Sequence, residues 1–319
     1  MNTVYRDVAG PCLAPQGSVV CIGAFDGVHR GHRAVLERAR ERAENLRAVP
    51  VAVTFAPIPR AYFAEIPQLS SPREKIQALI GAGMQRVLLL RFNAAMAATT
   101  AEDFIARVLV ERLAAREVWI GEGFHFGHAR KGDLALLQQL GAEEWFSADA
   151  VAPFLVGNER VSSTRIRAAL AAGEFEIAAE LLGRPFSIGG HVVRGQQLGR
   201  KLGYPTANIR LGSRVAPVGG VFAVRVHGIG ATPLPGVASL GTRPTIASTS
   251  VKEPVLEAHL FDFDGDIYGK RIEVEFARKL RNEEKYPDLD AMVKQIDRDA
   301  LSARKILGVP VRAKSGVPA

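Results

Sequence analysis

The sequence predicts two folds in one chain: a parallel β-sheet covered by helices over residues 1–184, then a small antiparallel β-barrel with a C-terminal helix over residues 185–319. Three observations support this. Strand-like and helical patterns alternate in the first part, and short β-rich runs separated by glycine and proline follow. The chain then ends on a helical pattern, and 319 residues exceed what one hydrophobic core usually organises.

The first part repeats a strand, a loop and a helix. Residues 18–22 form a short continuous apolar run, which is typical of a buried strand, and residues 31–46 carry apolar side chains at helical spacing. The same pattern predicts further strands at 51–55, 86–90 and 118–120, and further helices at 74–82 and 101–113. Alternation of this kind predicts a parallel sheet with its ligand crevice at the carboxyl ends of the strands.

The second part changes its periodicity after Leu182. Strands are predicted at 191–193, 221–226, 236–240, 255–261 and 272–276. Such regular spacing favours a small antiparallel barrel. A final helix, 289–307, places Met292, Ile296, Leu301 and Ile306 near one stripe, which we expect to close the barrel. Glycine and proline at 183–185 predict the domain boundary there.

Composition narrows the class of protein. A hydrophobic content of 47% with 23% charged residues is ordinary for a globular chain, and Cys12 and Cys21 make neither a disulfide framework nor a zinc motif. No leader peptide and no membrane-spanning run is evident, so we expect a cytoplasmic protein without a membrane partner. The net charge of +8 suits a polyanionic ligand, but the arginines are scattered, so we expect no nucleic-acid partner.

A motif that could bind phosphate lies between the first strand and the first helix. Residues 23–32 read Gly-Ala-Phe-Asp-Gly-Val-His-Arg-Gly-His. Glycines and free helix amides let the backbone approach an anion, and His29 and His32 could both point at one phosphoryl group. The alternative is a turn with incidental histidines.

A second cluster, 161–167, begins a predicted helix and contains three hydroxyl residues followed by two arginines. One hydroxyl would serve as an N-cap, which is the alternative explanation. Three hydroxyls with Arg165 and Arg167 exceed what capping needs, and together they favour a pyrophosphate cradle.

The motifs at 23–32, 121–127 and 162–167, in this order, resemble the adenylyltransferase half of the bacterial bifunctional riboflavin kinase/FMN adenylyltransferases, also called FAD synthetases. The resemblance implies that the phosphate of FMN attacks the α-phosphorus of ATP and that pyrophosphate leaves. His29 and His32 would then hold the transferring group as catalytic residues. The other residues it implies are Arg167, also as a catalytic residue on the triphosphate, and, for binding, Gly23, Phe25, Asp26, Gly31, Phe126, Ser163 and Thr164. The chain departs from the family at Ala56, Ile58 and Gly123, where polar residues are common.

The second part lacks the glycine-rich Lys-Ser/Thr loop of common NTPases, so a kinase here would need another scaffold. Residues 195–208 form a glycine-interrupted basic loop that ends in Thr206 and Asn208, whose side-chain oxygens suit Mg²⁺. A plain hairpin loop is the alternative. Glu257 and His259 alternate on a predicted strand; Glu257 could act as a general base or belong to a solvated face, and His259 is expected to be structural.

The motifs at 205–208, 241–245, 263–269 and 280–283 are similar to those of riboflavin kinases. The resemblance implies that Thr206 and Asn208 bind Mg²⁺·ATP, and that Glu257 deprotonates the terminal ribityl hydroxyl, which attacks the γ-phosphate. The binding residues it adds are Gly195, Arg200, Gly203, Pro205 and Arg281.

The predicted function is therefore the conversion of riboflavin to FMN and of FMN to FAD, with riboflavin, FMN and ATP as small-molecule partners and apoflavoproteins as recipients of FAD. One alternative is a riboflavin kinase whose first domain has degenerated, which the residues Ala56, Ile58 and Gly123 favour. Another is a basic, non-catalytic protein that binds nucleic acid or senses flavin. Neither the histidine pair nor the Thr-Ala-Asn turn is needed for that second alternative.

Overall fold

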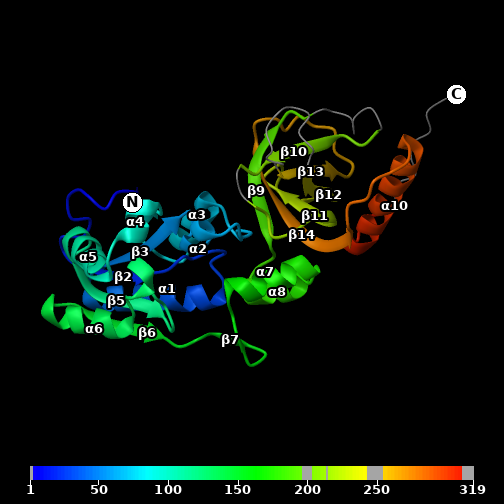
Figure 1. The fold of residues 1–319 in the computed structure, drawn as a ribbon. Helices are drawn as coiled ribbons and strands as arrows, with labels where there is room; N and C mark the ends of the chain where they lie inside the picture. Colours follow the sequence, from blue (N-terminus) through cyan, green and yellow to red (C-terminus); the bar gives the residue numbers. More distant parts are fainter. Residues whose placement is uncertain (1–2, 196–202, 213–214, 243–253, 311–319) are drawn as a thin grey trace. The chain divides into compact units, whose positions relative to one another are not determined.

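The computed structural model describes residues 3–195, 203–212, 215–242 and 254–310 (Figure 1). The chain forms two compact units. The first comprises Met1–Arg165 with Leu181–Gly183, and the second comprises Ile166–Glu180 with Arg184–Ala319. The predicted class, a helix-covered parallel sheet followed by an antiparallel barrel, is confirmed.

The first unit is built on a six-stranded sheet in the order β1-β4-β3-β2-β5-β6, in which every neighbouring pair is parallel. Its strands are β1 (Thr3–Tyr5), β2 (Ser18–Ile22), β3 (Val49–Ala56), β4 (Arg86–Arg91), β5 (Ala115–Gly121) and β6 (Ser147–Val151). All five residues of β2 are buried, as a strand covered on both faces requires. The sequence patterns did not predict the two edge strands, β1 and β6.

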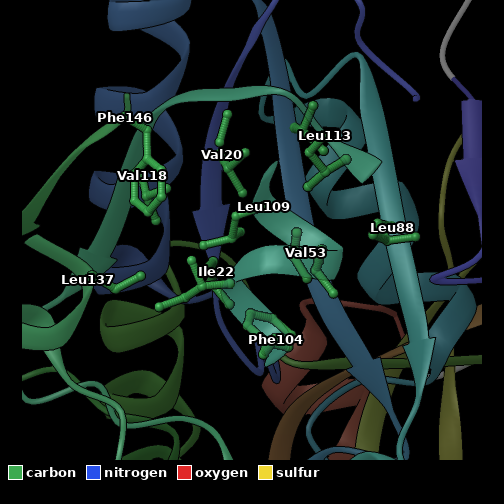
Figure 2. Packing of buried hydrophobic residues seen from close by; sticks show 14 of the residues in the cluster. Val20, Ile22, Val53, Leu88, Phe104, Leu109, Leu113, Val118, Leu137 and Phe146 are labelled. Carbon is green, nitrogen blue, oxygen red and sulfur yellow. The ribbon is translucent and has the colours of Figure 1, made fainter. Parts of the chain in front are cut away.

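Helices cover both faces of this sheet. They are α1 (Arg30–Leu46), α2 (Pro59–Phe63), α3 (Pro72–Gly81), α4 (Ala94–Ala98), α5 (Ala101–Phe104), a π-helix (Ile105–Arg112), a short 3₁₀-helix (His128–Arg130) and α6 (Leu134–Glu143). Val20 and Ile22 of β2 face a core formed with α5, the π-helix and α6, shown in Figure 2. Val19 and Cys21 face the opposite core with α1 and α3. Alternate residues of one strand therefore supply both cores.

Two helices of this unit begin at strong N-terminal signals. Ser71 and Glu74 form a capping box at the start of α3, with Pro72 in the first turn. His29 caps α1, whose residues Val35, Leu36, Ala39 and Ala43 are buried at the predicted helical spacing. The segment predicted as a single helix at 101–113 is instead α5 followed by the π-helix. Both helix types bury a similar apolar stripe here, so the spacing of apolar residues did not separate them.

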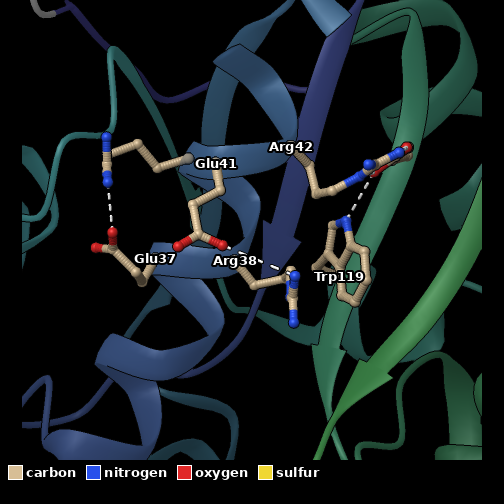
Figure 3. A network of polar contacts seen from close by, with 7 residues as sticks. Glu37, Arg38, Glu41, Arg42 and Trp119 are labelled. Atoms are coloured by element: carbon tan, nitrogen blue, oxygen red, sulfur yellow. Dashed lines mark hydrogen bonds and ion pairs between the residues drawn. The ribbon is translucent and has the colours of Figure 1, made fainter. Parts of the chain in front are cut away.

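The outer side of α1 is tied to β5 by polar contacts (Figure 3). The Arg42 guanidinium donates to both carboxylate oxygens of Glu117, and the Trp119 indole N–H donates to the same carboxylate at 3.0 Å. Arg38 lies over the Trp119 ring, 5.5 Å from its centroid, and pairs with Glu41 at 3.8 Å. Arg38 and Arg42 of this helix thus form local ion pairs.

The second unit contains a closed six-stranded barrel in the order β10-β13-β12-β11-β14-β9. Its strands are β9 (Ser187–Val193), β10 (Thr206–Arg210), β11 (Gly220–His227), β12 (Leu234–Thr242), β13 (Pro254–Leu260) and β14 (Arg271–Arg281). All neighbours are antiparallel. Leu256, Ala258 and Leu260 of β13 are buried at alternate positions, which leaves Glu257 and His259 on the outer face.

The C-terminal helix α10 (Leu289–Leu307) contacts β11, β12 and β14. Its predicted apolar stripe is partly wrong, because Leu301 and Ile306 are exposed, whereas Asp299 and Ala303 are buried. Ala303 packs with Ala223 and Phe261 in a small core, and Asp299 forms a buried ion pair. The apolar residues alone did not identify the face of α10 that packs on the barrel, because this helix packs through small residues and an ion pair.

Helices α7 (Ser163–Ala172) and α8 (Phe175–Leu182) precede the barrel in the chain. Phe175 is 3% exposed, and its ring centroid lies 5.7 Å from that of Phe222 and 6.1 Å from that of Phe276. These contacts place residues 166–180 in the second unit, although the sequence predicts the boundary after Arg184. Within the described part of the chain, no helix has the length and apolarity needed to cross a membrane.

Candidate functional site

A cavity of about 880 Å³ opens in the first unit where three parallel strands end. Ile22, Phe55 and Gly121, at or next to the carboxyl ends of β2, β3 and β5, belong to its wall. This is where a parallel sheet is expected to bind its ligand. Seven of the sequence-predicted residues line the cavity: Gly23, Phe25, His29, Gly31, His32, Phe126 and Ser163.

The two histidines form one compact group in this cavity. Their rings are stacked, with centroids 3.6 Å apart and planes inclined by 16°. The Nδ1 atom of His29 accepts a hydrogen bond from the backbone N–H of His32 at 3.3 Å, so His29 both caps α1 and faces the cavity. Phe25 meets the His32 ring edge-on at 5.2 Å. The sequence prediction that both imidazoles serve one site is consistent with this geometry.

The His32 side chain is neutral in the free site. Burial lowers the pKa of His32 well below its usual value, and the charges of His29, Lys75 and Arg160 lower it further. Its Nδ1 atom is buried and has no hydrogen-bond partner among the described residues. A buried polar atom without a partner is costly, and a ligand oxygen or phosphate hydroxyl would satisfy it.

Asp26 does not line the cavity. It is 1% exposed, and its carboxylate accepts hydrogen bonds from the backbone N–H groups of Leu69 at 3.0 Å and Ser70 at 3.1 Å. The Gly27 N–H in turn donates to the Ser70 hydroxyl at 3.0 Å. In this structure, Asp26 therefore anchors the loop of residues 23–32 to the segment before α3.

The start of α7 brings the hydroxyl cluster to the same region. The Ser163 hydroxyl donates to the Asp26 carbonyl at 3.0 Å, and the Thr164 hydroxyl accepts from Arg60 at 3.2 Å. Ser162 accepts from the backbone N–H of Arg165, which is the capping role that the alternative assigned to one hydroxyl. Arg167 lies on α7 within the second unit and does not line the cavity.

Sequence reasoning missed three arginines that line the cavity: Arg60, Arg130 and Arg160. Arg160 is fixed by a hydrogen bond from its guanidinium to the Glu122 carbonyl at 2.8 Å. In a chain with 41 lysines and arginines, no local signal distinguishes these three from arginines on a solvated surface. They give the cavity the positive charge that a nucleotide requires.

The cavity wall also contains many aromatic side chains. Phe55, Phe63, Phe92, Phe104, Phe124 and Phe126 all line it. Phe63 remains 70% exposed, and its ring meets that of Phe92 at 5.9 Å. A planar heteroaromatic ring would cover such a surface favourably.

Two of the family departures lie on the cavity wall. Ile58 and Gly123 both line it, and Ile58 is 4% exposed as the N-cap residue of α2. Gly123 has φ of +71°, a conformation that asparagine also tolerates better than most residues. Ala56 ends β3 opposite Arg91. The histidine pair and the three arginines are therefore present in the cavity although the polar side chains common in the family are absent at positions 56, 58 and 123.

In the second unit, the predicted kinase residues meet on two neighbouring strands. Asn208 of β10 pairs with Glu257 of β13, and Thr206 pairs with His259. Directly opposite side chains in an antiparallel pair lie on the same face, about 5 Å apart. A hydroxyl, an amide oxygen and a carboxylate are thus adjacent, and hard oxygen donors of this kind fit Mg²⁺. The described residues contain no group of three or more His, Cys, Asp or Glu that could hold a metal.

The loop residues around this pair of strands have separate roles. A Cβ atom on Gly195 would lie 2.5 Å from the Asn208 amide, so a larger residue would require that side chain to move. Gly203 has φ of +83° and precedes Tyr204 and Pro205. Arg200, the predicted phosphate ligand, lies outside the described residues.

His259 has a structural environment, as expected. Its Nδ1 contacts the Pro205 carbonyl at 2.9 Å, and its ring meets those of Tyr204 and Phe261 edge-on. Burial lowers the pKa of His259, while the bond to Pro205 opposes that shift. The side chain thereby fixes the loop that leads into Thr206.

Arg281, predicted to bind substrate, is engaged with α10. Its Nε and Nη2 atoms donate to both oxygens of Asp299 at 2.8–3.1 Å, and Gln295 donates to the same carboxylate. The side chain of Asp299 is 7% exposed, so the pair is nearly buried. In this structure Arg281 anchors the helix to β14.

The chain is similar to known proteins in both sequence and structure. The family model described as FAD synthetase matches residues 13–165, and the model described as riboflavin kinase matches residues 182–307. A bifunctional riboflavin kinase/FMN adenylyltransferase of Escherichia coli K12 is 44% identical over 310 residues, covering 96% of this chain and 98% of that protein. A protein of the same name from Pseudomonas fluorescens is 43% identical, covering 91% and 93%.

A solved structure from Streptococcus pneumoniae, described as a macrolide-efflux protein, is 29% identical to this chain. It superposes with a TM-score of 0.76 and covers 94% of this chain and 98% of its own length. The two-unit architecture is therefore shared with a protein solved independently.

Proposed function

Because the chain belongs to the bacterial family of bifunctional riboflavin kinase/FMN adenylyltransferases, we propose that its two units divide the two reactions between the two sites described above. The protein phosphorylates riboflavin to FMN and transfers an adenylyl group from ATP to FMN, giving FAD. We assign adenylyl transfer to the cavity of the first unit. Riboflavin phosphorylation is assigned to the paired strands β10 and β13 of the second unit.

The observation that carries the first assignment is the stacked histidine pair at the start of α1, inside a cavity that both arginines and phenylalanines line. Such a cavity offers cations to a triphosphate and flat apolar surface to a flavin or adenine ring. The proposed binding residues include the predicted set, with Asp26 holding the loop from behind and with Arg60, Arg130 and Arg160 added.

In the proposed reaction, a phosphate oxygen of FMN attacks the α-phosphorus of ATP while the bond to the pyrophosphate leaving group breaks. His29 and His32 donate hydrogen bonds to the transferring phosphoryl oxygens, where negative charge builds up. Ser163, Thr164 and Arg167 bind the departing pyrophosphate. The protein forms no covalent bond, and positioning with charge stabilisation accounts for the rate.

In the proposed kinase reaction, Glu257 accepts the proton of the terminal ribityl hydroxyl, and the hydroxyl oxygen attacks the γ-phosphorus of ATP as ADP leaves. Thr206 and Asn208 hold Mg²⁺·ATP on the same outer face of the barrel. Bound Mg²⁺ supplies positive charge to the phosphates. Gly195, Arg200, Gly203 and Pro205 complete the proposed nucleotide loop, and Arg281, which Asp299 holds in place, is proposed to bind substrate.

We further propose that the reactions take place in the cytoplasm and that FAD passes from the protein to apoflavoproteins. The family membership, with both units present, favours two working activities over the alternative of a degenerate first domain. The intact histidine pair, together with the His32 Nδ1 atom that has no hydrogen-bond partner among the described residues, also argues against degeneration. A non-catalytic basic protein would need neither feature.

The test uses two variants of the full chain and separates the flavins by chromatography over time. With FMN, ATP and Mg²⁺ supplied, His32→Ala should lower FAD formation by about 10²-fold or more, because removing one preorganised donor typically has that effect. With riboflavin supplied, Glu257→Ala should lower FMN formation by about 10²–10⁴-fold. Each variant should retain the other activity.

The exposed His128, which does not line the cavity, provides a matched control for His32. His128→Ala should leave both reactions unchanged. If either His32→Ala or Glu257→Ala silenced both reactions in a folded protein, the division of the activities between two independent sites would be wrong.

A further inference from the structure

Lys75, in the first unit, is a buried lysine that the proposed reaction does not use. It is 2% exposed on α3, and its ammonium donates to the Phe55 carbonyl at 2.7 Å and to the Thr54 hydroxyl at 3.4 Å. Among the described residues, it forms no ion pair with a carboxylate. Burying an ammonium group on uncharged oxygens alone is expensive for a protein.

The two oxygens that Lys75 contacts belong to the end of β3, which borders the cavity. Phe55 lines the cavity directly. The Thr54 hydroxyl donates to the Ala24 carbonyl at 3.1 Å, in the loop that carries the histidines. A chain of hydrogen bonds thus runs from α3 through Thr54 to this loop.

A second connection joins the same helix region to the same loop. The Asp26 carboxylate accepts from Leu69 and Ser70, which immediately precede the capping box of α3. The loop is therefore held at Ala24 from one side and at Asp26 from the other. Lys75 contributes to the first of these connections and is not itself in the cavity wall.

The charge of Lys75 reaches the histidine pair. Burial lowers the pKa of Lys75 to about 8, and attraction to Asp26 opposes that shift. Lys75 in turn lowers the pKa of His32, after burial and the charge of His29. The charged and titratable groups that bear on this region are Asp26 in the loop, which attracts Lys75, and His32, which is also affected by His29 and Arg160. Glu74, next to Lys75 on α3, accepts a hydrogen bond from the Ser71 backbone N–H.

A neutral donor would serve the hydrogen bonds to Phe55 and Thr54 equally well. Attraction to Asp26 offsets only part of the cost of a full positive charge at this place in the free protein, and a second anion nearby in the same low-dielectric region would stabilise the charge further. A nucleoside triphosphate, held by the histidines and arginines, is an anion of the required charge and position.

We propose that Lys75 is a positioning residue of the adenylyl-transfer site, which holds the histidine loop through Thr54 and supplies a fixed positive charge that favours ATP and the departing pyrophosphate. Lys75 acts through the loop and through its field, and touches neither substrate. The inference rests on the assignment of adenylyl transfer to this cavity.

The kinetic test compares the wild type with Lys75→Met, which keeps the length of the side chain and removes its charge. Lys75→Met should raise the KM for ATP in FAD formation from FMN about 10-fold or more, corresponding to about 1.4 kcal/mol of lost binding. Riboflavin phosphorylation by the same protein should stay unchanged, and thermal unfolding of the full chain, compared with the wild type, should show that the first unit is folded.

The pH dependence of FAD formation distinguishes an effect of the Lys75 charge from an effect of its hydrogen bonds alone. Lys75 is protonated below about pH 8 in the free protein and loses its charge above it. In the wild type, kcat/KM for ATP in FAD formation should therefore fall as the pH rises through 8, and this limb should be absent in Lys75→Met. Thr54→Val removes the hydroxyl bridge and keeps the charge, so it should retain the limb.

Calorimetry gives a measurement that needs no turnover. At pH 8.5, binding of Mg²⁺·ATP without flavin should draw a proton onto Lys75, visible as a dependence of the binding heat on the ionisation enthalpy of the buffer. The kinase unit contributes equally in all variants, so the difference between wild type and Lys75→Met reports the first site.

Loss of the proton uptake and of the pH limb in Lys75→Met supports the proposal. A pH limb that persists in Lys75→Met, or absence of proton uptake in the wild type, overturns it, and the second result needs no variant to fold. Failure of the site assignment is distinguishable, because FAD formation would then survive His32→Ala whatever Lys75→Met does.

Discussion

At the scale of single residues, the stacked histidines and the buried lysine share one electrostatic constraint. Two imidazoles 3.6 Å apart with an ammonium group behind them cannot all be charged without a large repulsion. In the free protein, His32 accommodates this by staying neutral. Elsewhere, charged residues predicted to bind substrate are paired internally, as Arg281 is with Asp299. Side chains therefore take their roles from the charges and donors around them.

This constraint predicts how His32 titrates. Its pKa lies well below 6.5, chiefly because of burial, so a lowered pKa leaves the ring neutral throughout the range above about pH 6.5. NMR of the imidazole nitrogens, with the His32 signal assigned by its loss in His32→Ala, should show one neutral tautomer from pH 6.5 to 8.5. Protonation of His32 with a midpoint near pH 6.5 would contradict the proposed environment.

At the scale of elements, the ends of strands and the spacing between strands position the chemistry. The end of β3 is held by Lys75 of α3, and Thr206 and Asn208 of β10 are placed against β13 by the barrel register. The close approach of β12 to β13 is one condition for that register. A Cβ atom on Gly236 of β12 would lie 2.2 Å from the His259 carbonyl of β13.

Gly236→Ala should therefore separate these two strands and destabilise the barrel by about 3 kcal/mol, in the range of other overpacking changes. The free energy of unfolding would be measured in urea, with riboflavin kinase activity as the probe of the folded barrel. Gly212→Ala is a matched control, because Gly212 has φ of +65° but no atom within 4 Å of the position that an added methyl group would take, so only a backbone cost of about 1 kcal/mol is expected. Equal effects of the two substitutions would argue against steric separation of the strands.

At the scale of the whole molecule, the chain is two compact units, each with its own core and its own candidate site. The units do not divide at a single point in the sequence. Residues 166–180 belong to the second unit through contacts such as those of Phe175 with Phe222 and Phe276, whereas Leu181–Gly183 belong to the first. The family model for riboflavin kinase begins at residue 182, after these helical contacts.

A fragment of residues 163–319 should consequently be more stable than one of residues 185–319. The shorter fragment lacks Phe175 and leaves apolar barrel surface uncovered, and the loss of one buried phenylalanine typically costs about 3 kcal/mol or more. Thermal unfolding of both fragments would measure the difference. Introducing Phe175→Ala into the longer fragment should remove much of its advantage, and equal melting of the two unmodified fragments would show that the helix contacts contribute nothing.

Local patterns in the sequence were sufficient for most elements of the fold. The alternation of apolar runs predicted β2, α1, β3 and the change to a barrel, because burial of one stripe or one face imposes a period on the residues. The histidine motif also pointed to two residues that line the cavity of the first unit, since it joins a strand to a helix within ten consecutive residues. The edge strands β1 and β6 were not predicted, because a short edge strand buries too few side chains to impose a regular hydrophobic period on its sequence.

Only the tertiary structure decided which charged residues line the cavity and which support the fold. Arg60, Arg130 and Arg160 line the cavity, whereas Asp26 and Lys75 lie behind it, and nothing in their local sequence separates the two groups. The stripe of α10 was assigned partly wrongly for the same reason, because Asp299 is buried in an ion pair while Leu301 and Ile306 are exposed. The energy of a charge depends on partners that are distant in the chain, so it becomes readable only when the fold brings those partners together.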